Sequence, residues 1–365
     1  MTTLAVSSPE TSKPDGKPTG ARFDFQVIMA FFAIYVIWGS TFLAIRTAVL
    51  LAPPWFCAGV RFFVAGTVLF AFARLRGTRG PSLREWRSLG IVGVLMFSVT
   101  YGALFWGEQY VPSGMTSILE ATLPLMTVLL EVFVLRQQKF RWRVLVAVAV
   151  GFCGVAVMML KSGHSSLDGV GVFPCLVILG GSASWSLGAV LTRSLVLPKS
   201  RVMTAGAEMM LGGSVLLILS LASGELHPFP VISPKAAFAL VYLIVAGSLV
   251  GFTAFVWLLG RMPASRVASH AYVNPIVAIA LGYFAASEKI TLWTLLGAGL
   301  VLGSVALSMG GAVTSAPERR EGFRRLSKKL GVAFRDKHPG STPDFVQGPV
   351  VEHHQNNTQT QEISR

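Results

Sequence analysis

Ten apolar runs, each near the length of a membrane-spanning helix, alternate with short polar stretches along the chain. An α-helix rises about 1.5 Å per residue, so about 20 apolar residues cross the hydrocarbon core of a bilayer. The runs lie near residues 25–45, 55–73, 88–106, 113–135, 143–160, 170–192, 203–222, 236–257, 264–286 and 291–312. This pattern predicts an all-α integral membrane protein with ten transmembrane helices.

Basic residues are shared unevenly between the two sides that ten helices define. Cytoplasmic loops of membrane proteins carry an excess of Lys and Arg. One set of loops holds Arg74, Arg76, Arg79, Arg84, Arg87, Arg136, Lys139, Arg141, Arg143, Arg193, Lys199, Arg201, Arg261 and Arg266. The other set holds only Arg46, Lys161, Lys235 and Lys289. We therefore expect both termini to be cytoplasmic.

Composition and charge agree with a membrane class. Hydrophobic residues make up 53% of the 365 residues and charged residues only 13%, with a mean hydropathy of +0.62. The net charge is +14, but the basic residues lie between apolar runs. We therefore expect a lipid bilayer and no nucleic acid as partner. Cys57, Cys153 and Cys175 lie in or beside apolar runs without closely spaced partners, which indicates packing residues and no metal site.

Polar segments flank the apolar region. Residues 1–24 are expected to form a disordered cytoplasmic tail, and the first apolar run is interpreted as a retained helix rather than a signal peptide. Residues 316–337 are basic, with apolar residues at helical spacing. Two interpretations stay open for this segment: an amphipathic helix on anionic inner-leaflet lipids, or a disordered basic tail. Residues 338–365 are expected to be disordered.

The two halves of the chain, 25–160 and 170–312, align with each other. At an offset of 147 residues, Trp38, Ala58, Gly59, Arg61, Gly66, Val68 and Leu69 correspond to Trp185, Ala205, Gly206, Glu208, Gly213, Val215 and Leu216. At an offset of 151, Ala103, Trp106, Pro112, Pro124 and Trp142 correspond to Ala254, Trp257, Pro263, Pro275 and Trp293. Each half holds five predicted spans, an odd number, so the halves insert in opposite orientations. Inverted repeats are typical of transporters that hold substrate near the bilayer midplane.

A series of short motifs runs in order through residues 28–312. They are Tyr35-Val-Ile-Trp-Gly-Ser-Thr41, Ala58-Gly-Val-Arg-Phe62, Val111-Pro-Ser-Gly114, Ala121-Thr-Leu-Pro-Leu125, Ser184-Trp185, Gly206-Ala-Glu-Met209 and Ala271-Tyr-Val-Asn-Pro275 with Glu288. On these motifs the chain resembles the EamA branch of the drug/metabolite transporter superfamily, and within it the YedA-like group. The resemblance implies ten helices in two EamA-type repeats. It also implies efflux of amino acids, related metabolites or drugs across a bacterial inner membrane.

Charged residues inside a predicted span each need an account, because insertion scales assign a cost of about 2.5–3.5 kcal/mol to such a charge. Arg61 and Glu208 occupy equivalent repeat positions, each roughly 9 Å from helix ends that face opposite sides of a core roughly 30 Å thick. We therefore expect no direct salt bridge between them. Each is expected to face its own vestibule or to pair locally. Glu131 lies near the cytoplasmic end of its span and is expected to be interfacial.

Glu120 lies about seven residues into the fourth predicted span and shortly before Pro124. A proline supplies no N–H, so it frees the carbonyl of Glu120 and is expected to kink the helix. A kinked polar stretch at mid-depth is typical of a substrate or proton site. Glu120 is therefore either a proton carrier or a packing carboxyl group with satisfied hydrogen bonds. Pro275 is expected to kink the ninth span in the same way.

Deep aromatic and polar residues complete the candidate cavity. Trp38 and Trp185 lie within their spans among small polar residues, which favours either a cavity wall or ordinary helix packing. The candidate cavity residues outside the charged set are Trp38, Ser40, Thr41, Tyr101, Trp185, His270, Tyr272 and Asn274, of which His270 is more typical of a packed histidine. Gly299 and Gly303 have the spacing for close helix contact, within the chain or in a homodimer.

The sequence predicts a secondary transporter that works by alternating access on a small-molecule substrate. It holds no phosphate-binding loop, zinc-protease helix or nucleophile elbow, so we expect no enzyme activity and no cofactor, with proton coupling as an open possibility. The alternatives are an importer or exchanger of the same fold, for example for sugars or nucleotide sugars, and a membrane sensor or scaffold that uses the basic C-terminal segment.

Overall fold

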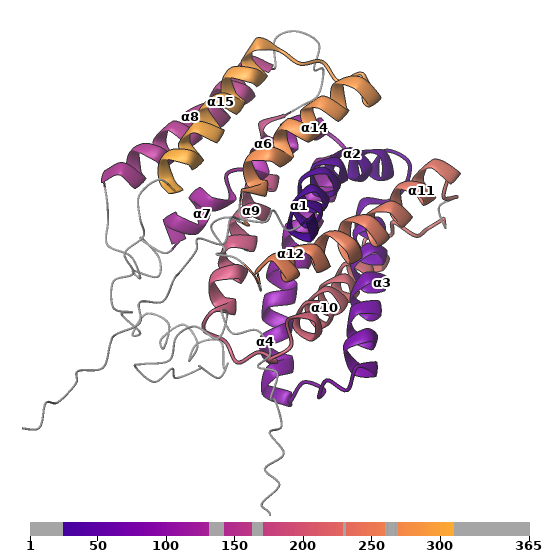
Figure 1. Ribbon diagram of the computed structural model, residues 1–365. Coiled ribbons are helices and arrows are strands. Elements are labelled where there is room, and N and C mark those ends of the chain that lie inside the picture. The colour runs from indigo at the N-terminus through magenta and orange to yellow at the C-terminus, as the bar shows by residue number, and fades with distance from the viewer. Residues whose placement is uncertain are drawn as a thin grey trace, which may run out of the picture.

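The computed structural model describes residues 25–130, 142–162, 171–228, 231–259, 261, 267 and 269–309. Every regular element in these ranges is a helix, and η marks a π-helical segment (Figure 1). The elements are α1 (Phe25–Phe32), η1 (Ala33–Ile37), α2 (Trp38–Val49), α3 (Pro54–Leu75), α4 (Leu83–Gly93), η2 (Val94–Val99), α5 (Thr100–Gly107), α6 (Ser113–Glu120), α7 (Leu123–Leu129), α8 (Trp142–Ser162), α9 (Val172–Thr192), α10 (Arg201–Ala222), α11 (Pro234–Tyr242), η4 (Leu243–Val250), α12 (Gly251–Leu259), α14 (His270–Ala286) and α15 (Leu292–Met309). The predicted tails, 1–24 and 338–365, and the basic segment 316–337 lie outside the described residues, as does Glu131.

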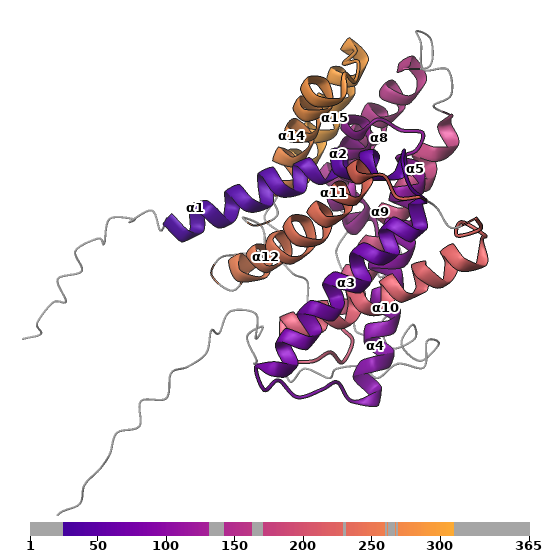
Figure 2. The ribbon, with the colours of Figure 1, turned by 90° about the vertical axis from the view of Figure 1, so that its right-hand side faces the viewer.

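Helices long and apolar enough to cross a bilayer account for much of the described chain. There are six among the described residues: Phe25–Val49, Pro54–Leu75, Leu83–Gly107, Val172–Thr192, Arg201–Ala222 and Pro234–Leu258. Shorter apolar helices occupy Leu145–Met158, His270–Ala286 and Leu292–Leu307. On α1, which extends away from the other helices in Figure 2, large apolar side chains such as Phe25 and Ile28 are exposed. The predicted all-helical integral membrane protein is confirmed at this level.

Local sequence sets several helix ends. Ser82 and Glu85 form a reciprocal capping box at the start of α4, in which each side chain accepts a hydrogen bond from the other residue's backbone N–H. Ser233 caps α11, whose first turn contains Pro234. α14 ends at Ser287, which adopts a left-handed conformation with φ 55°.

The fourth predicted span, 113–135, is broken rather than continuous. α6 ends at Glu120, a turn follows at residues 121–122, and α7 begins at Leu123. Pro124 lies in the first turn of α7. A proline at this position has no N–H to donate to the carbonyl of Glu120, so the hydrogen-bond ladder stops there. α14, in contrast, is helical through Pro275; it begins at His270, and residues 264–266 and 268 of the ninth predicted span lie outside the described residues.

α3 and α10 cross in close backbone contact, and Figures 1 and 2 show the two helices side by side. A Cβ atom built on Gly66 would lie 2.3 Å from the backbone nitrogen of Met210. A Cβ atom built on Gly213 would lie 2.3 Å from the backbone nitrogen of Phe63. Gly66 and Gly213 are equivalent in the internal alignment, so the two halves contribute the same glycine to this crossing.

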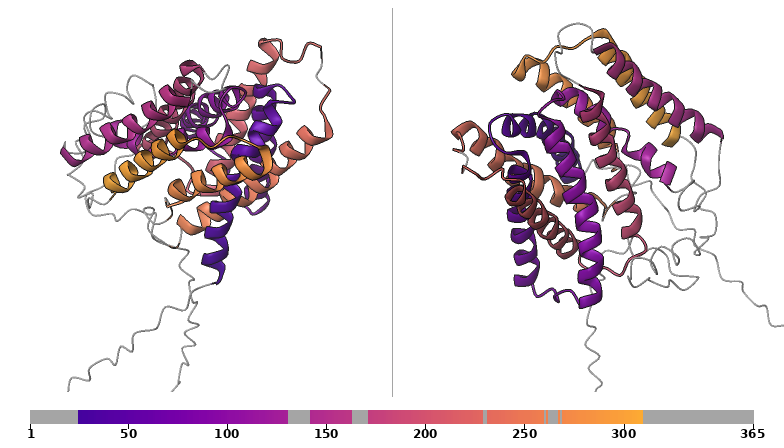
Figure 3. Two further views of the ribbon diagram at one scale, coloured as in Figure 1. Left: turned by 90° about the horizontal axis from the view of Figure 1, so that it is seen from above. Right: turned by 180° about the vertical axis from the view of Figure 1, so that it is seen from behind.

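Other helices pack in pairs that the internal alignment also relates. α8 lies against α15 at the edge of the bundle, where Figure 3 shows the two running side by side. Gly154 and Gly297 face each other in that pair, since a Cβ on either glycine would lie 2.8 Å from the other's carbonyl oxygen. α5 packs on α9, and in the second half α12 packs on α1.

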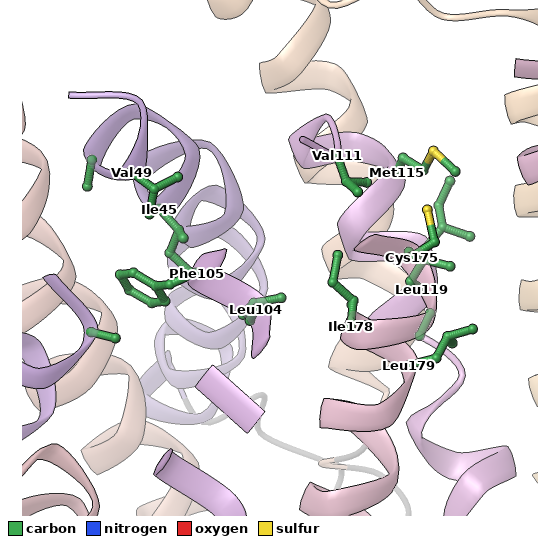
Figure 4. Close-up of a cluster of buried hydrophobic side chains, with 14 of the residues drawn as sticks. Ile45, Val49, Leu104, Phe105, Val111, Met115, Leu119, Cys175, Ile178 and Leu179 are labelled. Atoms are coloured by element: carbon green, nitrogen blue, oxygen red, sulfur yellow. The ribbon is translucent and has the colours of Figure 1, made fainter. Parts of the chain in front are cut away.

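The largest apolar core joins elements of both halves. Figure 4 shows part of it, where Ile45 and Phe105 of the first half lie in the same cluster as Ile178 of the second. All three are at most 1% exposed. Because burial of such side chains contributes about 1.5–3 kcal/mol each, this core fixes α2, α5, α6 and α9 relative to one another around the polar residues described next.

Candidate functional site

A first group of rings brings together α2, α12 and α14. The ring centroids of Trp38 and His270 lie 5.0 Å apart edge to face, and those of Trp38 and Phe255 lie 5.2 Å apart. The indole N–H of Trp38 donates a hydrogen bond to the carbonyl of Gly247 at 3.1 Å. His270 Nδ1 lies 2.9 Å from the carbonyl of Val267. Trp38 and His270, two of the predicted cavity residues, thus lie in contact.

A second group of rings brings together α3, η2, α5 and α9. Tyr101 has its ring centroid 4.4 Å from that of Phe62 and 6.0 Å from that of Trp185. Phe97 contacts the same three rings, at centroid distances between 5.1 and 6.1 Å. Trp185 is the repeat equivalent of Trp38, so each half places its deep tryptophan in a cluster of rings.

Arg61 lies between the two ring groups. Its guanidinium carbon is 4.8 Å from the ring centroid of Phe62 and 5.4 Å from that of Tyr101, which are cation–π distances. Its Nε donates to Ser248 Oγ at 3.0 Å. A Cβ built on Gly247, whose carbonyl accepts from Trp38, would lie 3.1 Å from Arg61 Nη2. Trp38, Phe62, Phe97, Tyr101, Trp185, Phe255 and His270, with Arg61 between them, are called the aromatic cluster below.

Arg61 is 3% exposed, and its Nη1 has no hydrogen-bond partner among the described residues. A buried guanidinium N–H without an acceptor is costly, since buried polar groups in proteins are nearly always paired. The expectation that Arg61 and Glu208 do not pair directly agrees with the geometry: Glu208 Oε1 also lacks a partner among the described residues, although the side chain is only 6% exposed.

The hydroxyl groups of Ser40 and Thr41, which follow Trp38 on α2, form hydrogen bonds with the backbone of the same helical segment and with α11. Ser40 Oγ donates to the carbonyl of Ile37 at 2.8 Å and lies 2.6 Å from the hydroxyl of Tyr242. Thr41 Oγ1 donates to the carbonyl of Trp38 at 2.6 Å. Both contacts lie next to η1 and η4, where π-helical geometry alters the backbone pairing, a feature frequent at functional sites.

Glu120 contacts α9 at the break between α6 and α7. Its Oε1 accepts a hydrogen bond of 2.7 Å from Ser182 Oγ. One turn further along α9, Ser186 donates to the carbonyl of Leu123 and lies 3.1 Å from Thr127 Oγ1. Glu120, Tyr101, Trp38 and Trp185 are each half-buried, so these deep side chains retain surface that a small molecule can contact.

Tyr272 and Asn274, two further predicted site residues on α14, are not members of the aromatic cluster. Tyr272 packs beside the apolar cluster of Leu125, Ala147, Val148 and Val305. Asn274 is 9% exposed, its Oδ1 has no partner among the described residues, and its backbone carbonyl lies against Gly39. Among the described residues, no group of three or more His, Cys, Asp or Glu side chains could hold a metal ion.

A pocket of about 730 Å³ opens at the ends of α2, α6, α11, α14 and α15, the ends toward the upper part of Figure 1. Its lining includes Arg46, Lys235, Glu288 and Lys289 together with Leu43, Met115 and Ile279. Three of the four cations in the sparsely charged set of loops therefore lie on one pocket. In the sequence these cations indicate only the orientation of the helices, and no local pattern marks them as a site.

Arg46 and Glu288 form a polar network at this pocket. Arg46 Nη1 donates to the carbonyls of Glu108 at 2.6 Å and Val111 at 2.7 Å, and Arg46 Nε lies 3.6 Å from Glu288 Oε1. Glu288 accepts hydrogen bonds from the backbone N–H of Ser113 at 2.9 Å and of Gly114 at 3.2 Å, and so caps α6. Because these residues are up to 242 positions apart, only the folded chain brings them together.

Comparison with known proteins decides the family. The model of the EamA-like transporter family matches the chain twice, over residues 25–160 and 172–310. The chain belongs to the EamA-like transporter family. The matches cover most of the apolar region, and each contains one of the deep tryptophans of the aromatic cluster. The resemblance stated from sequence motifs is thereby confirmed.

Curated relatives of this EamA-like chain are named as transporters. The "Uncharacterized inner membrane transporter YedA" of Escherichia coli (strain K12) is 38% identical over 282 residues, which is 76% of this chain and 89% of the relative. The "Uncharacterized transporter YvbV" of Bacillus subtilis (strain 168) is 27% identical over 77% of this chain and 90% of the relative. The "Probable terminal-alkyne amino-acid exporter" of Streptantibioticus cattleyicolor is 26% identical over 77% of this chain and 93% of the relative. A solved crystal structure shares the fold, with a TM-score of 0.52 at 19% identity over 78% of this chain and 97% of the other.

Family, relatives and helices agree on class and location. The EamA-like chain is a membrane transporter, and it is a multi-pass protein of the inner membrane. The family and the names of the relatives indicate a transporter rather than an enzyme.

Proposed function

We propose that this EamA-like protein is a secondary active exporter that moves small amphipathic metabolites, of the amino-acid class, from the cytoplasm by alternating access. The observation that carries the proposal is the aromatic cluster, to which both halves contribute a deep tryptophan and in which Arg61 keeps one N–H without a partner among the described residues. Drugs of similar size and shape are the wider substrate class that the same site would accept.

Two inverted five-helix repeats, with both termini cytoplasmic, are the architecture that we propose for this transport. Support comes from the α3–α10 crossing, where Gly59 contacts Gly213, the repeat equivalent of Gly66, and Gly66 contacts Gly206, the repeat equivalent of Gly59. A local two-fold axis through this crossing would exchange the halves. Inverted repeats allow two nearly equivalent packings, one open to each side of the membrane, around a site near the midplane.

The charges at the site favour a zwitterionic ligand. Arg61 offers a guanidinium N–H to a carboxylate, and the carboxylate of Glu120 can accept hydrogen bonds from an ammonium group. Rings of Trp38, Tyr101 and Trp185 supply flat surfaces for an apolar side chain. The chain is similar to a relative named as an amino-acid exporter, which points to the same class. Glu120 also remains our proposed proton carrier if transport is proton-coupled.

A metabolite comparison of culture supernatants tests the proposal. Cells would express the wild type, Trp38→Ala, Trp142→Ala or no transporter, with equal membrane abundance confirmed. Trp142 is 69% exposed and is not part of the aromatic cluster, so it serves as the matched control. We expect particular amino acids or related compounds to accumulate outside only with the wild type and Trp142→Ala.

The same experiment separates the rival functions. An importer or exchanger on this fold would deplete compounds from the medium in the wild type and Trp142→Ala cultures. Identical supernatants in all four cultures would contradict export of abundant metabolites. A sensor or scaffold would then be favoured, and removal of residues 316–365 would abolish its output.

A further inference from the structure

Glu108 is a carboxyl group that the proposed function does not use. It follows the last residue of α5 and begins the tight turn that leads into α6. Its side chain is 0% exposed, and neither Oε1 nor Oε2 has a hydrogen-bond partner among the described residues. Glu120 and Glu288, in contrast, each accept hydrogen bonds. A buried carboxylate without donors is among the most costly arrangements in a protein, so its neutral form is favoured.

The surroundings of Glu108 add to this preference. The buried chain neighbours Leu104, Phe105 and Val111 are apolar and at most 3% exposed. The charged groups that act on Glu108 are Arg46 on α2, Arg61 on α3, Glu120 on α6 and Glu288 after α14. Cys57 of α3 and Cys175 of α9 belong to the same apolar cluster as its neighbours Leu104 and Phe105. Two of the charged groups are carboxylates that repel a third negative charge. The cation that contacts Glu108 is Arg46, and its guanidinium already forms an ion pair with Glu288.

Arg46 nevertheless lies within reach of the Glu108 side chain. Its Nη1 donates to the backbone carbonyl of Glu108 itself at 2.6 Å, while its Nε faces Glu288. The guanidinium and this carboxyl group therefore belong to residues in direct contact, and a change of side-chain rotamers is the movement that would pair them. Arg46 and Glu288 also line the 730 Å³ pocket, which supplies a route between the network and the solution.

We propose that Glu108 is a proton-binding site: its carboxyl group carries a proton in the conformation described here and releases it when the guanidinium of Arg46 turns from Glu288 to pair with the carboxylate. The O–H bond of the acid breaks, the proton passes to water in the pocket, and the positive charge of Arg46 compensates the carboxylate that remains. Any role of this proton in driving export rests on the proposed function. The binding of the proton to Glu108 does not depend on that function.

Infrared spectroscopy of the purified protein tests proton binding without a known substrate. A protonated carboxylic acid has a C=O stretch well separated from that of a carboxylate. We expect the wild type to show this acid band at neutral pH, Glu108→Gln to lose an intensity equal to one carboxyl group, and Glu85→Gln to keep it. Glu85 is the matched control because its carboxylate accepts the backbone N–H of Ser82 at 2.7 Å. If Glu108→Gln does not yield a monodisperse protein, Glu108→Asp replaces it, and the band is expected to shift rather than vanish.

Titration of the acid band tests the role of Arg46. Removal of a nearby cation favours the neutral form of an acid. In Arg46→Gln the acid band should therefore persist to a higher pH than in the wild type. An unchanged band in Glu108→Gln, or no acid band in the wild type, would overturn the proposal and indicate a carboxylate held by water or by a metal cation. If the acid band titrated at the same pH in Arg46→Gln and in the wild type, the proposed movement of Arg46 from Glu288 to Glu108 would be refuted.

Discussion

Replacement of Gly66 or Gly213 by alanine should weaken the α3–α10 crossing. Each new Cβ would lie 2.3 Å from a backbone nitrogen of the facing helix, whereas ordinary contacts begin at 3.4 Å. Backbone atoms cannot rotate away, so the helices must separate locally by about 1 Å. Overpacking of this kind costs about 1–3 kcal/mol, while alanine regains up to about 1 kcal/mol of helix propensity. Because the clash is with backbone atoms, we take the upper part of this range, about 2–3 kcal/mol, and expect a net loss of about 1–2 kcal/mol from each substitution.

The thermal unfolding transition of the detergent-purified protein, followed by tryptophan fluorescence, measures this loss. Gly299→Ala is the matched control, because a Cβ at Gly299 would meet nothing within 4 Å. Its melting temperature should equal or exceed that of the wild type. The double variant Gly66→Ala/Gly213→Ala should lose less than the two single losses together, because one separation of the helices relieves both clashes. Single variants that melt at or above the wild type would refute the close crossing.

Three further predictions concern the described helices and the C-terminal region. Ser182→Ala removes the donor to Glu120 Oε1, so we expect it to lower stability by about 1 kcal/mol, measured by thermal unfolding, and to reduce export in the supernatant assay. Glu225→Gln weakens the cap that the carboxylate provides to the backbone N–H groups of Trp55 and Phe56, with an expected loss of about 1 kcal/mol in the same unfolding assay. Removal of residues 316–365 should leave export unchanged, and loss of export at equal membrane abundance would contradict a dispensable tail.

Much of the helical fold could be predicted because the bilayer imposes a simple rule on sequence. Apolar runs near 20 residues mark helices, and the run 203–222 lies within α10, Arg201–Ala222. Irregular segments inside an apolar run were harder to predict from the sequence. The π-helical segments η2 and η4 change no apolar residue into a polar one, so hydropathy does not reveal them. The break after Glu120 carried a signal, Pro124, but sequence alone could not distinguish a kink from a complete break.

The candidate site could be predicted only in part. Deep tryptophans and a charged residue in a span are visible in sequence, and Trp38, Arg61 and Trp185 do lie in one cluster of contacts. Glu108 follows the end of a span, where an acidic residue is typical of a loop. It is 0% exposed in the folded chain, where the preceding helix α5 packs against α9 and α2, and these contacts are not visible in the sequence. The pairing of Arg46 with Glu288 depends on tertiary contacts that no local pattern encodes.

The π-helical segments also show where the two halves of the chain differ. η2 (Val94–Val99) corresponds, at an offset of 151, to residues 245–250 within η4. η1 (Ala33–Ile37) corresponds, at an offset of 147, to residues 180–184 of α9, which is α-helical throughout Val172–Thr192. The two halves therefore share one π-helical segment, whereas the segment before Trp38 has an α-helical counterpart before Trp185. Trp38 and Trp185 thus follow backbones of different geometry, and an exchange of the two halves would not superpose their rings.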